Sequence, residues 1–282
     1  MNASALDPQM PMTSWTQVAS LSRLRRDEPL FTAAGLFLLA LMIPTGAALL
    51  IDTRDWAGVP GWIKPLKFQF ALGVYLLSLA FFARYLPEGL TARRSYRIYA
   101  ASIVAAVMAE MVWVGGAAML GTRSHFQIEG VGGILYGLMG FLALWLTGAS
   151  AYYAWQIARG SALGGNRVLK EGIVLGLAMV MPMTAITAGY MSGTGGHFVG
   201  TATGSINLAV LGWARDGGDL RVPHFFATHA LHLVPLAGLA ISAWIGPKAI
   251  WALRLSALVY LAFVVFVFWQ ALQGRPFLPF LG

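Results

Sequence analysis

Apolar residues in this chain gather into long runs that shorter polar segments separate. Several runs approach the roughly 20 residues that an α-helix needs to cross the hydrocarbon core of a bilayer. We therefore predict an all-α, polytopic membrane protein. The seven predicted spans cover about residues 31–51, 66–86, 98–120, 131–156, 171–191, 225–243 and 249–272.

Basic residues between these spans indicate how the chain is oriented. With the N-terminus inside, twelve of the 19 lysines and arginines fall in inner segments and seven in outer segments. Inner loops of membrane proteins carry such an excess of basic residues. We therefore predict an N-in/C-out bundle, with a cytoplasmic segment over 1–30, a transmembrane domain over 31–272 and a short outer tail over 273–282.

Composition agrees with this architecture and excludes several chemistries. Hydrophobic residues make up 58% of the chain and charged residues only 11%, too few for the surface of a soluble domain. The absence of cysteine excludes disulfides, thiolate metal sites, iron–sulfur clusters and a cysteine nucleophile. A net charge of +8 would suggest nucleic acid for a soluble protein. Topology and anionic lipid headgroups explain it here, so membrane lipids and not nucleic acid are the expected partners.

Polar residues on the predicted outer side form a less ordinary pattern. Three of the five histidines lie within "RVPHFFATHALH" (221–232), and the other two, His125 and His197, follow the third and fifth predicted spans. The outer connection over 192–223 is long and glycine-rich and contains an apolar piece, "INLAVLGWA" (206–214). Loops of this length without structure are uncommon unless functional or disordered. We expect a cap or re-entrant segment here.

Glu110 lies inside the third predicted span. A carboxylate at such depth costs at least ~2.5 kcal/mol, so we expect it to face the protein interior, either paired or protonated. At 1.5 Å per residue it lies about 15 Å below the outer end of its helix, and His232 lies about 12 Å below His224. Glu110, His232 and the threonines at 184 and 187 could therefore line an outward-opening funnel. The alternative is a protonated Glu110 that ties two helices together.

His229 and His232 are three residues apart and should share one helix face. Two histidines at that spacing can hold a metal ion together with a carboxylate from another helix. A divalent metal is thus a candidate cofactor, and haem is less favoured because no facing span carries a histidine in its core. The alternative is that each imidazole hydrogen-bonds a neighbouring helix. The candidate metal ligands are His224, His229, His232 and Glu110.

Charged residues also gather at the predicted outer ends of the spans. They are candidates for binding an anionic headgroup or a substrate carboxylate. The alternative is that they pair with one another or extend to the interface. These candidate substrate-binding residues are Lys64, Lys67, Arg123, Asp219 and Arg221.

The stretches "WIKPLKF" (62–68), "AEMV" (109–112), "GTRSHF" (121–126) and "GGDLRVPHFFATHALH" (217–232) together resemble a family of bacterial multi-pass membrane proteins of no established activity. The resemblance covers most of the chain and implies a bacterial inner-membrane location. The chain departs from the family pattern at Gln127, where the family has Asn, and at His232, where it has Gln. The matching positions are Lys64, Lys67, Glu110, Arg123, His125, Asp219, Arg221, His224 and His229.

Three functions fit this pattern. The first is a membrane-embedded enzyme, metal-dependent or not, that acts on a lipid-phase or small-molecule substrate with Glu110, His125 and His229 as catalytic residues. The second is a small proton-coupled permease that uses Glu110 as its protonation site. Against this, the inner half of the bundle shows no matching polar residues to complete a path. The third is a structural or assembly subunit in which the polar groups only lock the helices together.

Overall fold

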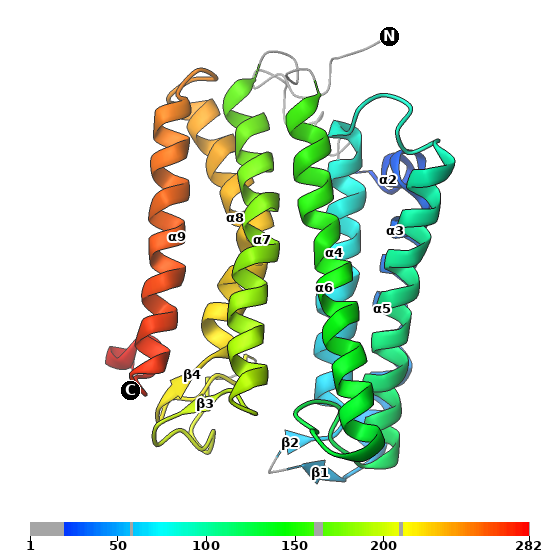
Figure 1. The fold of residues 1–282 in the computed structure, drawn as a ribbon, viewed down its shortest axis with the longest axis vertical. Coiled ribbons are helices and arrows are strands. Elements are labelled where there is room, and N and C mark those ends of the chain that lie inside the picture. Colours follow the sequence, from blue (N-terminus) through cyan, green and yellow to red (C-terminus); the bar gives the residue numbers. More distant parts are fainter. Residues whose placement is uncertain (1–19, 57–58, 161–165, 209–210, 282) are drawn as a thin grey trace. The chain divides into compact units, whose positions relative to one another are not determined.

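The structure is a computed structural model that describes residues 20–56, 59–160, 166–208 and 211–281. Most of the predicted cytoplasmic segment, residues 1–19, lies outside these ranges. The fold is about 74% helical, as predicted, and its few strands are two residues long (Figure 1). The helices are α2 (Leu21–Asp27), α3 (Pro29–Ile51), α4 (Ile63–Phe82), α5 (Arg94–Leu120), α6 (Gly130–Arg159), α7 (Arg167–Gly193), α8 (Arg221–Trp244) and α9 (Ile250–Leu272).

Seven of these helices, α3 to α9, are long and apolar enough to span a membrane, which confirms the predicted multi-pass architecture. Helix α4 is extended by a single 3₁₀ turn over Ala83–Tyr85. It starts earlier than the pattern predicts, because Pro65 sits in its first turn, where a missing backbone N–H is tolerated. Helix α8 likewise begins just before a proline, Pro223.

The chain divides into two compact units rather than one uniform group of helices. The N-terminal unit contains α2 to α5 and α6 as far as Ala149. The C-terminal unit contains α6 from Ser150 to Ala158 and then α7 to α9. Each unit is described by itself below.

Glycines bring α3 and α4 close together in the N-terminal unit. A Cβ atom on Gly35 would lie 3.0 Å from the carbonyl oxygen of Gly73, and one on Gly73 would lie 3.2 Å from that of Gly35. Small residues allow such close approach of membrane helices. Beside this contact, Gln69 Nε2 of α4 donates a buried hydrogen bond to Thr45 Oγ1 of α3 at 2.8 Å. The hydrogen bond between Gln69 and Thr45 fixes the rotation of α4 about its own axis. Helix α4 also carries Lys64.

The C-terminal unit is built around the contact between α7 and α8. A Cβ on Gly176 would lie 2.7 Å from both the carbonyl oxygen of Ala230 and the ring of Pro235. Gly172 meets Gly238 one turn further along, with 3.4 Å from its Cβ position to the opposing Cα. Helix α9 packs on this pair through Leu253, which is fully buried. Close packing therefore fixes the face of α8 that carries the histidines.

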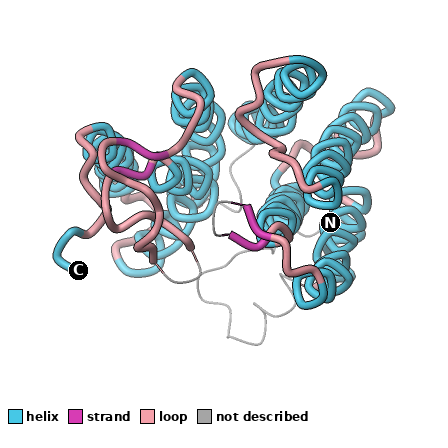
Figure 2. Tube along the Cα trace, turned by 90° about the horizontal axis from the view of Figure 1, so that it is seen from below, coloured by secondary structure: helices cyan, strands magenta, loops and turns pink. Residues whose placement is uncertain are grey.

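The described residues of the connection between α7 and α8, 194–208 and 211–220, form a folded cap loop, visible beside the helix ends in Figure 2. Strand β3 (Phe198–Val199) pairs antiparallel with β4 (Gly218–Asp219), and Asn207 bridges to Ala214. The loop packs against the end of α9, where a Cβ atom on Gly218 would clash with the carbonyl oxygen of Ala271. The predicted cap is thus a loop with short strands, and no helix forms in its described residues. A second short ladder joins β1 (Asp55–Trp56) to β2 (Val59–Pro60) between α3 and α4.

Candidate functional site around Glu110

Glu110 faces the interior of the N-terminal unit, as its depth in the third span predicts. Its side chain lies on α5 and the residue is only 4% exposed. Among the described residues, no group donates a hydrogen bond to its Oε1 atom. An unsatisfied buried carboxyl oxygen is costly and uncommon. This unsatisfied oxygen makes Glu110 a candidate for binding a proton or a ligand.

Lys64 supplies the charge that faces Glu110. It lies in the first turn of α4, is half-buried, and interacts electrostatically with the Glu110 carboxylate. Its Nζ atom also lies 5.9 Å from the ring centroid of Phe68, one turn further along the same helix. A cation at this distance from a ring is stabilised by it. The ammonium group is therefore held within the protein instead of extending freely into solvent.

His125 is the third member of this cluster. Its ring packs edge-on against Phe68, with 5.5 Å between centroids, and lies 5.9 Å from that of Tyr136. Burial, and secondly the charge of Lys64, lower the pKa of His125 to about 3. The imidazole is therefore neutral at ordinary pH. Its Nδ1 atom lies 3.0 Å from Ser124 Oγ. Two helices and the connection after α5 thus bring Lys64, Glu110 and His125 together.

Local backbone chemistry positions His125. Helix α5 ends at Gly121 in the left-handed conformation (φ 66°), and the N–H of Thr122 returns to the carbonyl of Ala117. Trp113 Nε1 then donates to the carbonyl of Ser124 at 2.9 Å, which ties the connection back to α5. Phe126 has a φ of 61°, which is unfavourable for a residue with a side chain. Strain of this kind concentrates at functional sites.

Four aromatic or hydroxyl residues of this cluster were missed by the sequence reasoning. Two carried a detectable pattern, because Phe68 follows Lys64 by four residues and Trp113 follows Glu110 by three, spacings that share a helix face. Ser124 and Tyr136 carried none, since their positions depend on how the connection folds back onto α5.

The histidines of α8 occupy the C-terminal unit and do not share one environment. His224 Nδ1 lies 3.0 Å from Thr187 Oγ1 on α7, the contact with a neighbouring helix that we gave as the alternative to a metal site. The ring of His229 stacks on Phe225 at 3.8 Å between centroids, and its Nδ1 lies 2.7 Å from the Phe225 carbonyl. His229 and His232 lie side by side, with ring centroids 5.5 Å apart, as their spacing predicts.

The predicted metal ligands fall in both units, Glu110 in the first and the three histidines in the second. Over the described parts of the chain, no three histidine, aspartate or glutamate side chains gather in a way that would hold a metal ion. His229 and His232 are the two predicted ligands that the structure brings side by side. A complete ligand set and a metal cofactor remain predictions.

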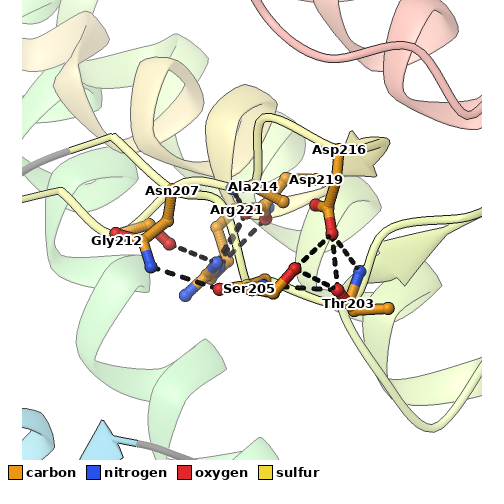
Figure 3. Close-up of polar contacts among 9 residues, drawn as sticks. Thr203, Ser205, Asn207, Gly212, Ala214, Asp216, Asp219 and Arg221 are labelled. Atoms are coloured by element: carbon orange, nitrogen blue, oxygen red, sulfur yellow. Dashed lines mark hydrogen bonds and ion pairs between the residues drawn. The ribbon is translucent and has the colours of Figure 1, made fainter.

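Asp219 and Arg221 use their hydrogen-bonding capacity inside the cap loop (Figure 3). The carboxylate of Asp219, which is 1% exposed as a residue, accepts from Arg221 Nη2 at 2.6 Å and from the N–H of Ala214 at 2.9 Å. Arg221 also donates to the carbonyl of Gly212 at 2.6 Å and lies 5.3 Å from the ring of Phe198. The geometry favours the structural interpretation for this pair over substrate binding.

The remaining charged residues at the predicted outer ends of the spans have different surroundings. Lys67 and Arg123 are exposed. Asp52 does not serve as a partner for the lysines, because Arg54 Nη2 at 2.6 Å and Trp62 Nε1 at 2.9 Å donate to it. These bonds hold the pKa of Asp52 well below its usual range. Lys64 therefore keeps Glu110 as its electrostatic partner.

No family model matches the chain, and neither a curated protein nor a solved structure resembles it closely enough to count as a match. The site is therefore assigned from its geometry, and the likeness to a bacterial membrane family remains a prediction from four sequence stretches.

Proposed function

We propose that this chain is a small proton-coupled transporter of the bacterial inner membrane in which Glu110 binds and releases the proton. The observation that carries the proposal is the Glu110 carboxyl group, which is buried within a span and has an oxygen without a hydrogen-bond donor. Ionisable residues inside membrane spans cost free energy to insert, and they mark ion or proton pathways. A carboxylate oxygen that accepts no hydrogen bond can take up a proton.

Further polar groups with unsatisfied atoms in the N-terminal unit support transport over surface catalysis. Gln69, about 7.5 Å inward of Lys64 along α4, has a buried Oε1 atom without a donor. At the inner end of α4, Arg84 lies 3.9 Å from Asp27, and its side chain is only 4% exposed. Both Nη atoms of Arg84 are buried without acceptors among the described residues. Unsatisfied polar atoms thus occur at several depths of one unit.

Lys64 gives the proposal a coupling mechanism. While Glu110 is ionised, the two charges compensate each other. When Glu110 takes a proton, Lys64 is left as an uncompensated, half-buried cation, which is unfavourable unless an anion replaces the carboxylate. Entry of a small anion is then linked to uptake of one proton. The substrate class that fits is a small monocarboxylate, because its carboxylate would replace the negative charge that Glu110 loses on protonation.

Proteoliposomes on a solid-supported membrane test this function through the current that follows an outer pH jump. We expect the wild-type protein to give a transient proton-binding current that lactate, used as the probe anion, converts into a sustained one. Glu110→Gln should reduce both currents at least about tenfold, because the amide cannot ionise. Lys64→Gln should retain a transient current and lose the response to lactate.

Glu88→Gln is the matched control, because Glu88 is an exposed carboxyl group in the loop between α4 and α5 of the same unit. It should leave both currents unchanged. Currents in Glu110→Gln equal to wild type would refute the proton-binding role. Loss of thermal stability in Glu110→Gln, with no proton current even in the wild-type protein, would identify the carboxyl group as structural.

A membrane-embedded enzyme is the second candidate, and the geometry of His229 favours it. A carbonyl oxygen can only accept a hydrogen bond, so its contact with Nδ1 places the ring proton there and the lone pair on Nε2. Such an arrangement orients histidines that bind metals or accept protons. His232 beside it supplies a second imidazole. A substrate or a further residue would have to complete the site.

Elemental analysis and an ultraviolet–visible spectrum of the detergent-purified protein test the enzyme candidate. We expect a stoichiometric divalent metal that His229→Ala loses, since the substitution removes one of the paired imidazoles. His232→Gln should retain part of the metal, because the resembling family has Gln at this position. Equal metal content in wild type, His229→Ala and a His197→Ala control would exclude His229 as a ligand.

A further inference from the structure

A groove of about 960 Å³ opens at the inner end of the N-terminal unit, away from the Glu110 cluster. Helix α2, the first residues of α3 and the first two turns of α5 line it. Arg26, Arg94 and Arg97 all contribute to this lining and all are exposed. Within the described chain none of these arginines forms an ion pair with a carboxylate. The groove therefore presents three cationic groups where the spans begin.

Acidic groups in the same lining do not cancel this charge. Asp27 is shared between Arg23 at 4.0 Å and Arg84 at 3.9 Å. Glu28 is 3% exposed and accepts a hydrogen bond from the hydroxyl of Tyr96. Burial raises the pKa of Glu28 despite that bond, which favours its neutral form. The positive charge of the three arginines is therefore left without a carboxylate counter-ion in the part of the chain that the structure describes.

The wall of the groove changes from basic to apolar along α5. Arg94, Arg97, Ile98 and Ala101 have the i, i+3, i+4, i+7 spacing that places residues on one helix face. Ile98 is 60% exposed, and Leu30 of α3, 37% exposed, lines the groove as well. Because α5 enters the membrane from Arg94 onward, the apolar part lies deeper than the basic part.

We propose that this groove binds an anionic phospholipid, with its phosphate group on the arginines and an acyl chain along Ile98 and Ala101. A cationic rim above an apolar wall matches the two ends of such a lipid, and basic pockets between membrane helices bind lipid headgroups in this way. The site is separate from Glu110 and does not depend on the transport proposal. A soluble phosphate-bearing anion would share the headgroup chemistry but gain nothing from the apolar wall.

The test compares binding of dioleoyl phosphatidylglycerol and dioleoyl phosphatidylcholine to the full purified chain by native mass spectrometry from detergent. We expect the anionic lipid to bind preferentially. Arg26→Gln combined with Arg94→Gln should weaken its binding roughly 30-fold, the loss expected for two basic side chains at a headgroup. The matched control is Arg25→Gln with Arg93→Gln, which removes the same charge from exposed neighbours outside the lining. It should retain the preference.

Two further measurements distinguish a bound phospholipid from a soluble phosphate-bearing anion. Ile98→Asn should weaken phosphatidylglycerol binding, and excess inorganic phosphate should not displace the lipid. Displacement by phosphate with no effect of Ile98→Asn would assign the groove to a soluble anion and overturn the lipid proposal. Equal losses in the two double variants would show that the preference follows net charge alone, which also overturns it. Thermal unfolding of every variant confirms that the chain remains folded.

Discussion

Carboxyl groups in the N-terminal unit differ in how the protein compensates their charge. Asp52 has donors from Arg54, two residues away, and from Trp62. Glu28 is bonded to Tyr96, across two helices. Glu110 has the electrostatic influence of Lys64, and no group in the described part of the chain donates a hydrogen bond to its Oε1 atom. At the scale of single residues, Glu110 is the candidate site because it combines an oxygen without a donor with a position inside a membrane span.

His125 gives a pH prediction at the same scale. Its pKa falls from an ordinary 6.5 to about 3 in the folded protein, chiefly through burial. The unfolded chain therefore binds a proton between these values while the folded chain does not, so stability is lost as the pH falls from about 6.5 toward 3. His125→Gln should flatten the decrease in Tm over this range, measured by thermal unfolding in detergent.

A matched variant at an unrelated histidine, His197→Gln, serves as the control for this pH dependence. The prediction concerns the difference in slope between wild type and His125→Gln, because other groups, Asp216 among them, also titrate at low pH. Parallel Tm curves for wild type and His125→Gln from pH 6.5 to pH 4 would show that His125 is not held neutral by its surroundings.

Helix pairs are the next scale, and glycines decide how closely they approach. Gly176 of α7 faces the backbone carbonyl of Ala230 and the ring of Pro235, neither of which can move aside easily. We predict that Gly176→Ala destabilises the protein by about 1–3 kcal/mol through overpacking. Because α8 would shift with its histidines, metal retention or activity that depends on His229 should fall as well.

Gly189 provides the control on the same helix, since nothing lies within 4 Å of its Cβ position. Gly189→Ala should be neutral or slightly stabilising, because alanine has the higher helix propensity. Thermal unfolding of the two variants side by side checks the prediction. A Gly176→Ala variant as stable as Gly189→Ala would mean that the α7–α8 contact is looser than the structure shows.

The cap loop shows how an element can change the role of predicted ligands. Asp219 and Arg221 stand out in the sequence as outer charged residues beside the histidines. In the folded loop they bond to each other and to the backbone at Ala214 and Gly212. Asp216 also bonds within the loop, because its Oδ2 atom accepts a hydrogen bond from Thr203 Oγ1 at 2.5 Å. Polar residues of the loop thus replace the hydrogen bonds that a helix or a longer sheet would supply.

At the scale of the whole molecule, the predicted orientation is open to a direct test because the chain contains no cysteine. Single cysteines introduced at Ile206 in the cap loop and at Glu88 between α4 and α5 are both at exposed positions. With the N-terminus inside, a membrane-impermeant maleimide should label Ile206→Cys in intact cells and Glu88→Cys only after permeabilisation. The opposite pattern would reverse the topology.

Much of the architecture was predictable because membrane-spanning helices are marked by local composition. The seven helices and their approximate limits follow from the length of each apolar run, and Glu110 stands out because a carboxylate inside such a run is costly. The pairing of His229 with His232 follows from helical periodicity alone. Each of these conclusions needs only residues that are close together in the chain.

Contacts between distant segments depend on packing that no local pattern encodes. The association of Lys64 and His125 with Glu110 requires the connection after α5 to fold back through Trp113 and the strained backbone of Phe126. The internal use of Asp219 and Arg221, and the groove between α2, α3 and α5, arise in the same way. Which polar groups meet is decided by side-chain fit between helices, because the hydrophobic effect that inserts each span is non-directional and cannot choose its partners.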